Sequence, residues 1–240
     1  MKQSRIRASW ILATVFLAAA AQVAVDPPHI ELNAATGLIE AVDSTWSGNN
    51  YNVRFTEGTV AGEMSYSLPL TTNPANDLDP RIACTAKGDV VVVWWRDLTT
   101  DAIVCRKRSI VTGAWSPEKL LGVANESGSR PRVVDVGNDA WVAYQIQKNQ
   151  TRAVGAQVIE DDSEPTRTIV ATTSYSGNLD IQIMFESGNL WITWIDSASR
   201  VGYSEYNPTT ELWTSAAVES FASDSIAAAR ARIRARILGN

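Results

Sequence analysis

The sequence predicts an all-β fold, a β-propeller-like array of four four-stranded antiparallel blade units with a repeat of about fifty residues. Two observations predict it. Three aromatic residues recur at intervals of fifty, namely Trp94, Tyr144 and Trp194. A glycine in a turn position precedes each of them, and these are Gly88, Gly137 and Gly188. A strand-built repeat of this length is typical of radial or stacked β arrays.

The four units are predicted at residues 29–72, 79–122, 129–171 and 178–218. In the first unit, Trp46 is taken as the aromatic counterpart of Trp94, and Gly37 supplies the turn. The second unit shows the pattern most clearly, with strands predicted at Arg81–Ala86, Val90–Trp95, Ala102–Arg108 and around Lys119–Leu121. Four blades that close alone and a partial propeller completed by self-association both remain open.

The second strand of each unit carries the strongest strand signal. Val90–Val93 is a run of β-branched residues, which suit a pleated surface. It is apolar on both faces, as a sheet between two other sheets requires. A β-sandwich also has short strands at regular spacing, but the matched glycines and aromatics favour the propeller.

Two units begin with a similar tetrapeptide. These are Asp79-Pro80-Arg81-Ile82 and Arg130-Pro131-Arg132-Val133. We expect Arg81 and Arg132 at the starts of the first strands of their blades.

The N-terminus predicts a secretory signal peptide over residues 1–21 and hence an exported protein, secreted or periplasmic. Lys2, Arg5 and Arg7 precede the uncharged stretch Trp10–Ala21, which ends in small residues suited to cleavage. That stretch is too short for the roughly twenty residues of a membrane span. Residues 22–28 form a linker that ends in two prolines.

The charge balance argues against nucleic acid and anionic membranes as partners. The 240-residue chain has 21 Lys and Arg against 26 Asp and Glu, a net charge of −5, which becomes −8 when the three cations of the signal peptide leave. The two cysteines are predicted as free thiols. Cys84 falls in a first strand and Cys105 in a third, about 9–10 Å apart. A disulfide needs Cα atoms within about 7 Å.

One turn resembles a known motif. Ser109-Ile110-Val111-Thr112-Gly113-Ala114-Trp115 resembles the Asp-box, Ser-x-Asp-x-Gly-x-x-Trp, of sialidase-like and related propellers, with Val111 at the Asp position and the Trp one residue early. In the fourth unit, Asn207–Trp213 keeps only the Trp. The resemblance implies that these turns join the third and fourth strands of a blade. It also implies six blades, about two more than this chain supplies.

Two further segments have a distinctive charge pattern. Residues 223–239 predict a basic amphipathic C-terminal helix, although the alternation of Arg230, Arg232, Arg234 and Arg236 also suits a strand. The acidic turn at residues 160–164 is interpreted as a solvated loop rather than a calcium site.

No catalytic constellation, metal site or cofactor motif is predicted. The sialidase-like resemblance implies an arginine trio that grips a carboxylate, and Arg81 and Arg132 suit two of its places, but a third arginine and a nucleophile cannot be assigned. His29, the one histidine, is interpreted as a surface residue. The leading hypothesis is an exported non-enzymatic propeller that binds a protein or glycan. The alternative is a degenerate or divergent glycoside-acting enzyme.

A ligand site is predicted at the end that holds the first-strand starts and the loops between second and third strands. The residues expected there are Arg81, Arg96, Asp97, Arg132, Gln147, Asp196 and Trp46. The opposite end, with the glycine turns and the Ser109–Trp115 turn, is expected to be structural.

Overall fold

The computed structural model describes residues 28–123, 125–149, 151–159, 167–173, 179–186, 188–195, 200–207 and 210–220, together with residue 235. The predicted signal peptide lies outside the described residues, and so do residues 22–27 of the linker and the acidic turn at 160–164. Apart from residue 235, the same holds for the predicted C-terminal helix.

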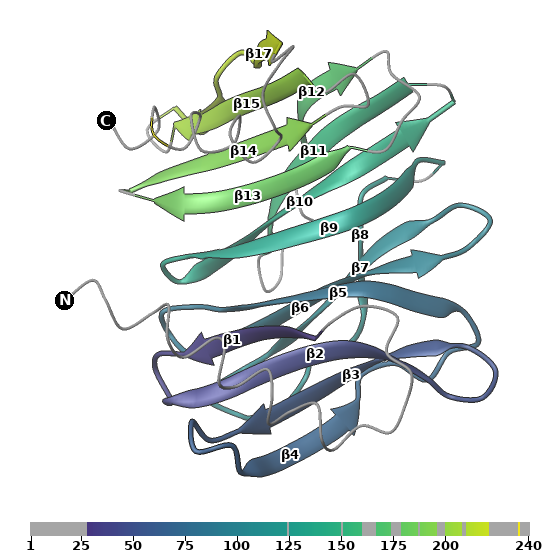
Figure 1. Cartoon of the computed structure of the whole chain (residues 1–240), viewed down its shortest axis with the longest axis vertical. Helices are drawn as coiled ribbons and strands as arrows, with labels where there is room; N and C mark the ends of the chain where they lie inside the picture. The colour runs from purple at the N-terminus through teal and green to yellow at the C-terminus, as the bar shows by residue number, and fades with distance from the viewer. Residues whose placement is uncertain are drawn as a thin grey trace.

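The described chain is all-β and forms four antiparallel sheets, each from consecutive strands (Figure 1). The first sheet holds β1 (His29–Asn33), β2 (Leu38–Trp46), β3 (Tyr51–Gly58) and β4 (Met64–Pro69). The second holds β5 (Asn76–Cys84), β6 (Val90–Asp97), β7 (Ala102–Arg108) and β8 (Lys119–Leu121). The third holds β9 (Ser127–Val136), β10 (Asp139–Lys148), β11 (Thr151–Ile159) and β12 (Thr168–Thr173). The fourth holds β13 (Asp180–Glu186), β14 (Asn189–Ile195), β15 (Arg200–Asn207), β16 (Leu212–Trp213) and β17 (Ala217–Ser220). Because β16 and β17 both pair with β15, they share the place of a fourth strand. The predicted array of four-stranded blade units is confirmed.

The four sheets follow one another in chain order, with the first and the fourth at opposite ends of the array (Figure 1). The first strands contact one another in the order β1, β5, β9 and β13. The described blades therefore form an open array, and its completion by self-association stays a prediction.

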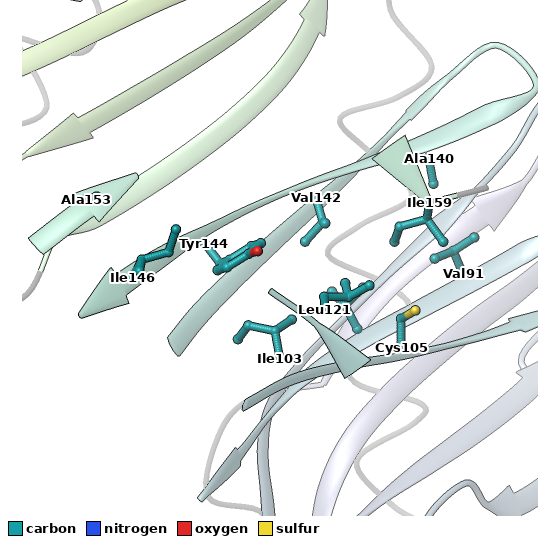
Figure 2. Close-up of a cluster of buried hydrophobic side chains, with 11 residues drawn as sticks. Val91, Ile103, Cys105, Leu121, Ala140, Val142, Tyr144, Ile146, Ala153 and Ile159 are labelled. Atoms are coloured by element: carbon teal, nitrogen blue, oxygen red, sulfur yellow. The ribbon is translucent and has the colours of Figure 1, made fainter. Parts of the chain in front are cut away.

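Three apolar clusters fill the spaces between successive sheets, one in each space. Figure 2 shows the cluster between the second and third sheets, where Val91, Ile103 and Leu121 meet Val142 and Tyr144. Both faces of β6 are used, because Val92 and Trp94 face the first sheet while Val91 and Val93 face the third. This explains the unbroken apolar run at Val90–Val93.

The fifty-residue aromatic repeat is a core repeat. Trp94, Tyr144 and Trp194 are 0%, 1% and 3% exposed, and each packs against the preceding sheet. Trp46 does not belong to the series. It ends β2 at the tip of a hairpin, is 42% exposed and contacts Tyr51 at a tilt, with ring centroids 5.0 Å apart.

The predicted turn glycines are also confirmed, since Gly37, Gly88, Gly137 and Gly188 all have positive φ. The Ser109–Trp115 turn connects the third strand β7 to the fourth strand of its sheet, as the Asp-box resemblance implied. Its Trp115 packs on Phe55 of the first sheet, with ring centroids 5.0 Å apart.

The expected position of Arg81 and Arg132 was wrong. Strand β5 begins at Asn76 and β9 at Ser127, so both arginines lie within their strands. The X-Pro pair that precedes each arginine forms a β-bulge, with Asp79 at φ 49° and Arg130 at φ 56°. Proline has no N–H for the ladder, and a bulge lets the strand continue past it.

Cys84 and Cys105 are free thiols, as predicted. Burial raises the pKa of both thiols above the ordinary range, so both remain protonated at neutral pH. Within the part of the chain that the structure describes, no helix has the length and apolar character needed to cross a membrane.

Candidate functional site

The bulges bring equivalent residues of successive blades to the same level of the array. His29, Arg81, Arg132 and Gln182 pair with Val42, Val93, Ala143 and Thr193 of the adjacent second strands, at intervals of about fifty residues. We call these four residues, with Asp79, the first-strand cluster. A proline precedes three of them, at Pro28, Pro80 and Pro131.

Asp79 joins two blades within this cluster. Its carboxylate forms an ion pair with Arg81 through Oδ1, and its Oδ2 lies 3.0 Å from Nη1 of Arg132. Each guanidinium also donates to the carbonyl of the proline before it, at 2.8 Å for Arg81 and 2.7 Å for Arg132. The left-handed conformation at Asp79 belongs to the bulge, so the backbone irregularity and the ionic contact occur at the same residue.

The three charged side chains are partly open to solvent. The exposed fractions are 17% for Asp79, 19% for Arg81 and 25% for Arg132. This placement leaves the guanidinium groups within reach of a ligand while limiting the screening of their charge.

His29 completes the cluster on the first blade. Its Nδ1 accepts a hydrogen bond from the backbone N–H of Ile82 at 3.2 Å, which fixes the neutral tautomer with the proton on Nε2. Burial, together with the charges of Arg81 and Arg132, lowers the pKa of His29 to about 4. The imidazole is therefore neutral at pH 7, and it is half-buried rather than the surface residue that the sequence indicated.

The cluster has the chemistry of an anion site. Two guanidinium groups from different blades converge on one carboxylate, and the formal charges of Arg81, Arg132 and Asp79 sum to +1. Arginine presents five N–H donors in a planar arrangement, which suits carboxylate and sulfate groups. A ligand anion can therefore bind the guanidinium groups alongside Asp79 or in its place.

Arg96 is held away from this cluster by two carboxylates. Its Nε lies 2.7 Å from Oδ1 of buried Asp77, and its Nη1 lies 2.8 Å from Oε2 of Glu118. Asp77 also accepts a hydrogen bond from the indole N–H of Trp94 at 3.0 Å. Arg96 thus ties β5, β6 and the segment before β8 together, and this geometry is structural.

The other residues predicted for the site are dispersed. Asp97, Gln147 and Trp46 are exposed at the hairpins between second and third strands. Asp97 accepts a hydrogen bond from Nδ2 of Asn76 at 3.4 Å. Asp196 lies outside the described residues. Of the predicted set, the structure brings Arg81 and Arg132 together.

His29, Asp79 and Gln182 were not predicted from the sequence as members of the cluster. A signal for the first was present, because Pro28-His29-Ile30 aligns with Pro80-Arg81-Ile82 and Pro131-Arg132-Val133. The prolines at 27–28 were interpreted only as the end of a linker, so the repeat was not extended to them. In the part of the chain that the structure describes, no three His, Cys, Asp or Glu side chains are grouped to hold a metal ion.

Comparison with known proteins gives a likeness of fold. No family model matches the sequence, and no curated protein matches it. Among solved structures, the Hadza microbial sialidase Hz136 is similar with a TM-score of 0.58 at 12% identity, over 78% of this chain and 45% of that one. The NanB sialidase from Streptococcus pneumoniae is similar with a TM-score of 0.59 at 7% identity, over 86% of this chain and 53% of that one. The intramolecular trans-sialidase from Ruminococcus gnavus, solved with oseltamivir carboxylate, has a TM-score of 0.60 at 8% identity, over 80% of this chain and 70% of that one.

The chain thus spans about half the length of the first two sialidases. At these identities the likeness is one of fold, and the fold is sialidase-like.

Proposed function

We propose that this protein is an exported, non-enzymatic propeller module that binds an acidic glycan through the first-strand cluster. The observation that carries the proposal is the convergence of Arg81 and Arg132, from two different blades, on the carboxylate of Asp79. The sialidase-like fold supports a sugar as the carrier of the anionic group, because one of the similar proteins was solved with a carboxylate ligand.

Asp79 has a definite role in this proposal. It holds two flexible arginine side chains in one place before the ligand arrives, which reduces the entropy lost on binding. Hydrogen bonds to charged groups contribute about 1.5–3 kcal/mol each. Loss of one guanidinium should therefore weaken binding about ten- to hundredfold.

The test is a glycan array that contains acidic glycans and their neutral counterparts, followed by titration of each hit. We expect binding to glycans with a carboxylate or sulfate, and Arg132→Gln should weaken it at least tenfold. Arg130→Gln is the matched control, because it removes the same charge from the same strand two residues away. It should change the affinity by less than about threefold.

Three results would contradict the proposal. The first is that neutral glycans bind as well as acidic ones, and the second is that Arg132→Gln retains the parent affinity. The third is that changes in the Ser109–Trp115 turn abolish binding in a folded protein while Arg81→Gln and Arg132→Gln do not. In the last case the ligand occupies the opposite end of the array.

A glycoside-acting enzyme is the second candidate, favoured by the sialidase-like fold and by a carboxylate beside two arginines. Incubation of each bound glycan with the protein, followed by analysis of released sugars, separates the two functions. Binding without release supports the binding module, and release that is lost in Asp79→Asn supports the enzyme.

Export is proposed from the N-terminal sequence. Expression with the N-terminus intact and sequencing of the exported product should give a mature chain that begins at Gln22. Retention of the full-length chain in the cytoplasm would contradict export.

A further inference from the structure

A separate hollow lies between the first and second sheets, at the end that carries the glycine turns. It has a volume of about 130 Å³, enough for several water molecules or a small organic group. The polar residues that line it are Asn33, Thr36, Glu40, Glu57, Arg108 and Ser109. The sequence indicated that this end is purely structural.

Glu40 is the unusual residue of this hollow. Its side chain is 1% exposed, and its Oε1 accepts a hydrogen bond from Nδ2 of Asn33 at 3.3 Å. Its Oε2 is buried without a hydrogen-bond partner. Natural proteins rarely leave a buried carboxylate oxygen unpaired, because the lost hydration is not replaced.

The neighbouring charges do not satisfy Glu40. Glu57 is its cross-strand partner on β3 and adds a second carboxylate on the same face. The cation nearby, Arg108, directs Nη1 to Oε2 of Glu57 at 2.5 Å and lies over the ring of Phe55 at 5.7 Å. The hollow therefore holds two carboxyl groups and one guanidinium, and that guanidinium is bound to Glu57.

This imbalance changes the protonation of Glu40. Burial and the nearby Glu57 raise its pKa, and against the opposing effects of Asn33 and Arg108 the net result is a pKa of about 7. The ionised form of Glu40 therefore has no cationic N–H donor paired with its Oε2 in the hollow.

We infer that the hollow is a binding site for the primary ammonium group of a small amine, which Glu40 receives as its missing ionic partner. An ammonium group carries one charge and three donors, which matches a site with one unpaired carboxylate. A divalent cation fits less well, because the described residues offer no group of three acidic, histidine or cysteine side chains. This inference is independent of the first-strand cluster and of the proposed function.

The experiment compares two ligands of similar size on the full chain by NMR titration. Ethanolamine carries an ammonium group, and ethylene glycol replaces it with a hydroxyl. We expect ethanolamine to shift the amide resonances of Asn33, Gly88 and Gly113 saturably, and ethylene glycol to leave them unchanged.

Two variants locate the charge. Glu40→Gln preserves the side-chain volume and an oxygen for Asn33, and it should weaken ethanolamine binding at least tenfold. Glu63→Gln removes the same charge from the exposed turn between β3 and β4 and should leave the affinity unchanged.

The pH dependence in the parent protein gives a second readout that needs no variant. Ethanolamine should bind the ionised form of Glu40, so its affinity should rise about tenfold per pH unit below the pKa and level off above it. The carboxyl carbon of Glu40 should titrate at a lower pH when ethanolamine is saturating.

Three outcomes overturn the inference. The first is that ethylene glycol shifts the same resonances with equal affinity, which would make the hollow a hydroxyl site. The second is that ethanolamine produces no saturable shift. The third is that the affinity for ethanolamine is the same in Glu40→Gln and at every pH between 5 and 8.

Discussion

Arg81, Arg96 and Arg132 carry the same charge and lie on the first or second strands of neighbouring blades. They differ in the groups that accept their hydrogen bonds. Arg96 meets two carboxylates, one of them fully buried at Asp77, and its guanidinium is held in the wall between strands. Arg81 and Arg132 share the partly exposed Asp79 instead. Under the proposed function, the guanidinium groups that share Asp79 attract a ligand anion, whereas Arg96 has a structural role.

The pKa of His29 is sensitive to the charges of Arg81 and Arg132. We expect the imidazole to remain neutral down to about pH 5, because its folded pKa is about 4 against 6.5 in the unfolded chain. The folded state binds the proton less readily, so this residue's contribution to stability is complete above pH 6.5 and is lost as the pH falls toward 4. The loss should reach about 2 kcal/mol after screening by solvent.

The measurement is the imidazole NMR titration, with the free energy of unfolding of the parent and of His29→Gln at several pH values. Arg132→Gln should raise the pKa of His29. An imidazole that titrates near 6.5 in the folded parent would contradict the arrangement.

The buried aromatic residues of the core repeat should contribute strongly to stability. Trp194 lies against Gly202 on β15, where even an added Cβ would come within 2.1 Å of the indole ring. Trp194→Ala should lower the free energy of unfolding by roughly 3–5 kcal/mol, because it empties a packed space between the third and fourth sheets.

Trp46→Ala serves as the control, since Trp46 is 42% exposed, and it should cost less than about 1 kcal/mol. Equal denaturation midpoints for the parent and Trp194→Ala would refute the assignment.

Among the elements, the first strands position the candidate site and the turns that follow them position the hollow. The bulges in β5 and β9 add one residue relative to the second strand, since Leu78–Arg81 spans three steps where its partner spans two. Without that extra residue the side chains after the proline would point to the opposite face.

The turn glycines differ in what they pack against, and this gives a prediction. Gly88 and Gly137 both have positive φ, so alanine at either position costs about 1 kcal/mol in backbone strain. At Gly88 a Cβ would also lie 2.9 Å from the Cβ of Ala35, whereas Gly137 has nothing within 4 Å. Gly88→Ala should therefore destabilise the protein by about 3 kcal/mol and Gly137→Ala by about 1 kcal/mol.

Chemical denaturation of the two variants tests this ordering. Equal losses of stability would show that the turn between β5 and β6 does not pack against the first sheet.

At the scale of the whole molecule, each apolar cluster belongs to two sheets, and the inner sheets contribute to two clusters each. Val91 and Val92 are adjacent on β6, yet they pack into different clusters. No described sheet has an apolar core of its own, which is the usual situation in repeat arrays.

We therefore expect the four sheets to unfold in one transition. Tryptophan fluorescence and far-UV circular dichroism should give the same midpoint, because Trp94 marks the first cluster boundary and Trp194 the last. A fluorescence midpoint that differs from the circular dichroism midpoint in the parent protein would indicate independent blades.

The sequence by itself determined the features that depend on neighbours along the chain. Alternation of side chains, β-branched runs and turn glycines act within a few residues, so the strand array, the turns at the glycines and the buried Trp94 and Trp194 could be predicted. The free thiols followed from strand order alone, because Cys84 and Cys105 are separated by a whole strand.

The tertiary structure decided what depends on contacts between strands and sheets. Local pattern does not specify that Asp77 receives Arg96, that Asp79 receives two arginines, or that His29 stands in line with them, because each contact joins residues from different strands. The bulges moved Arg81 and Arg132 into their strands, and the hairpin tip exposed Trp46. The hollow around Glu40 forms where the turns after β5 and β7 lie against the first sheet, so it depends on long-range packing.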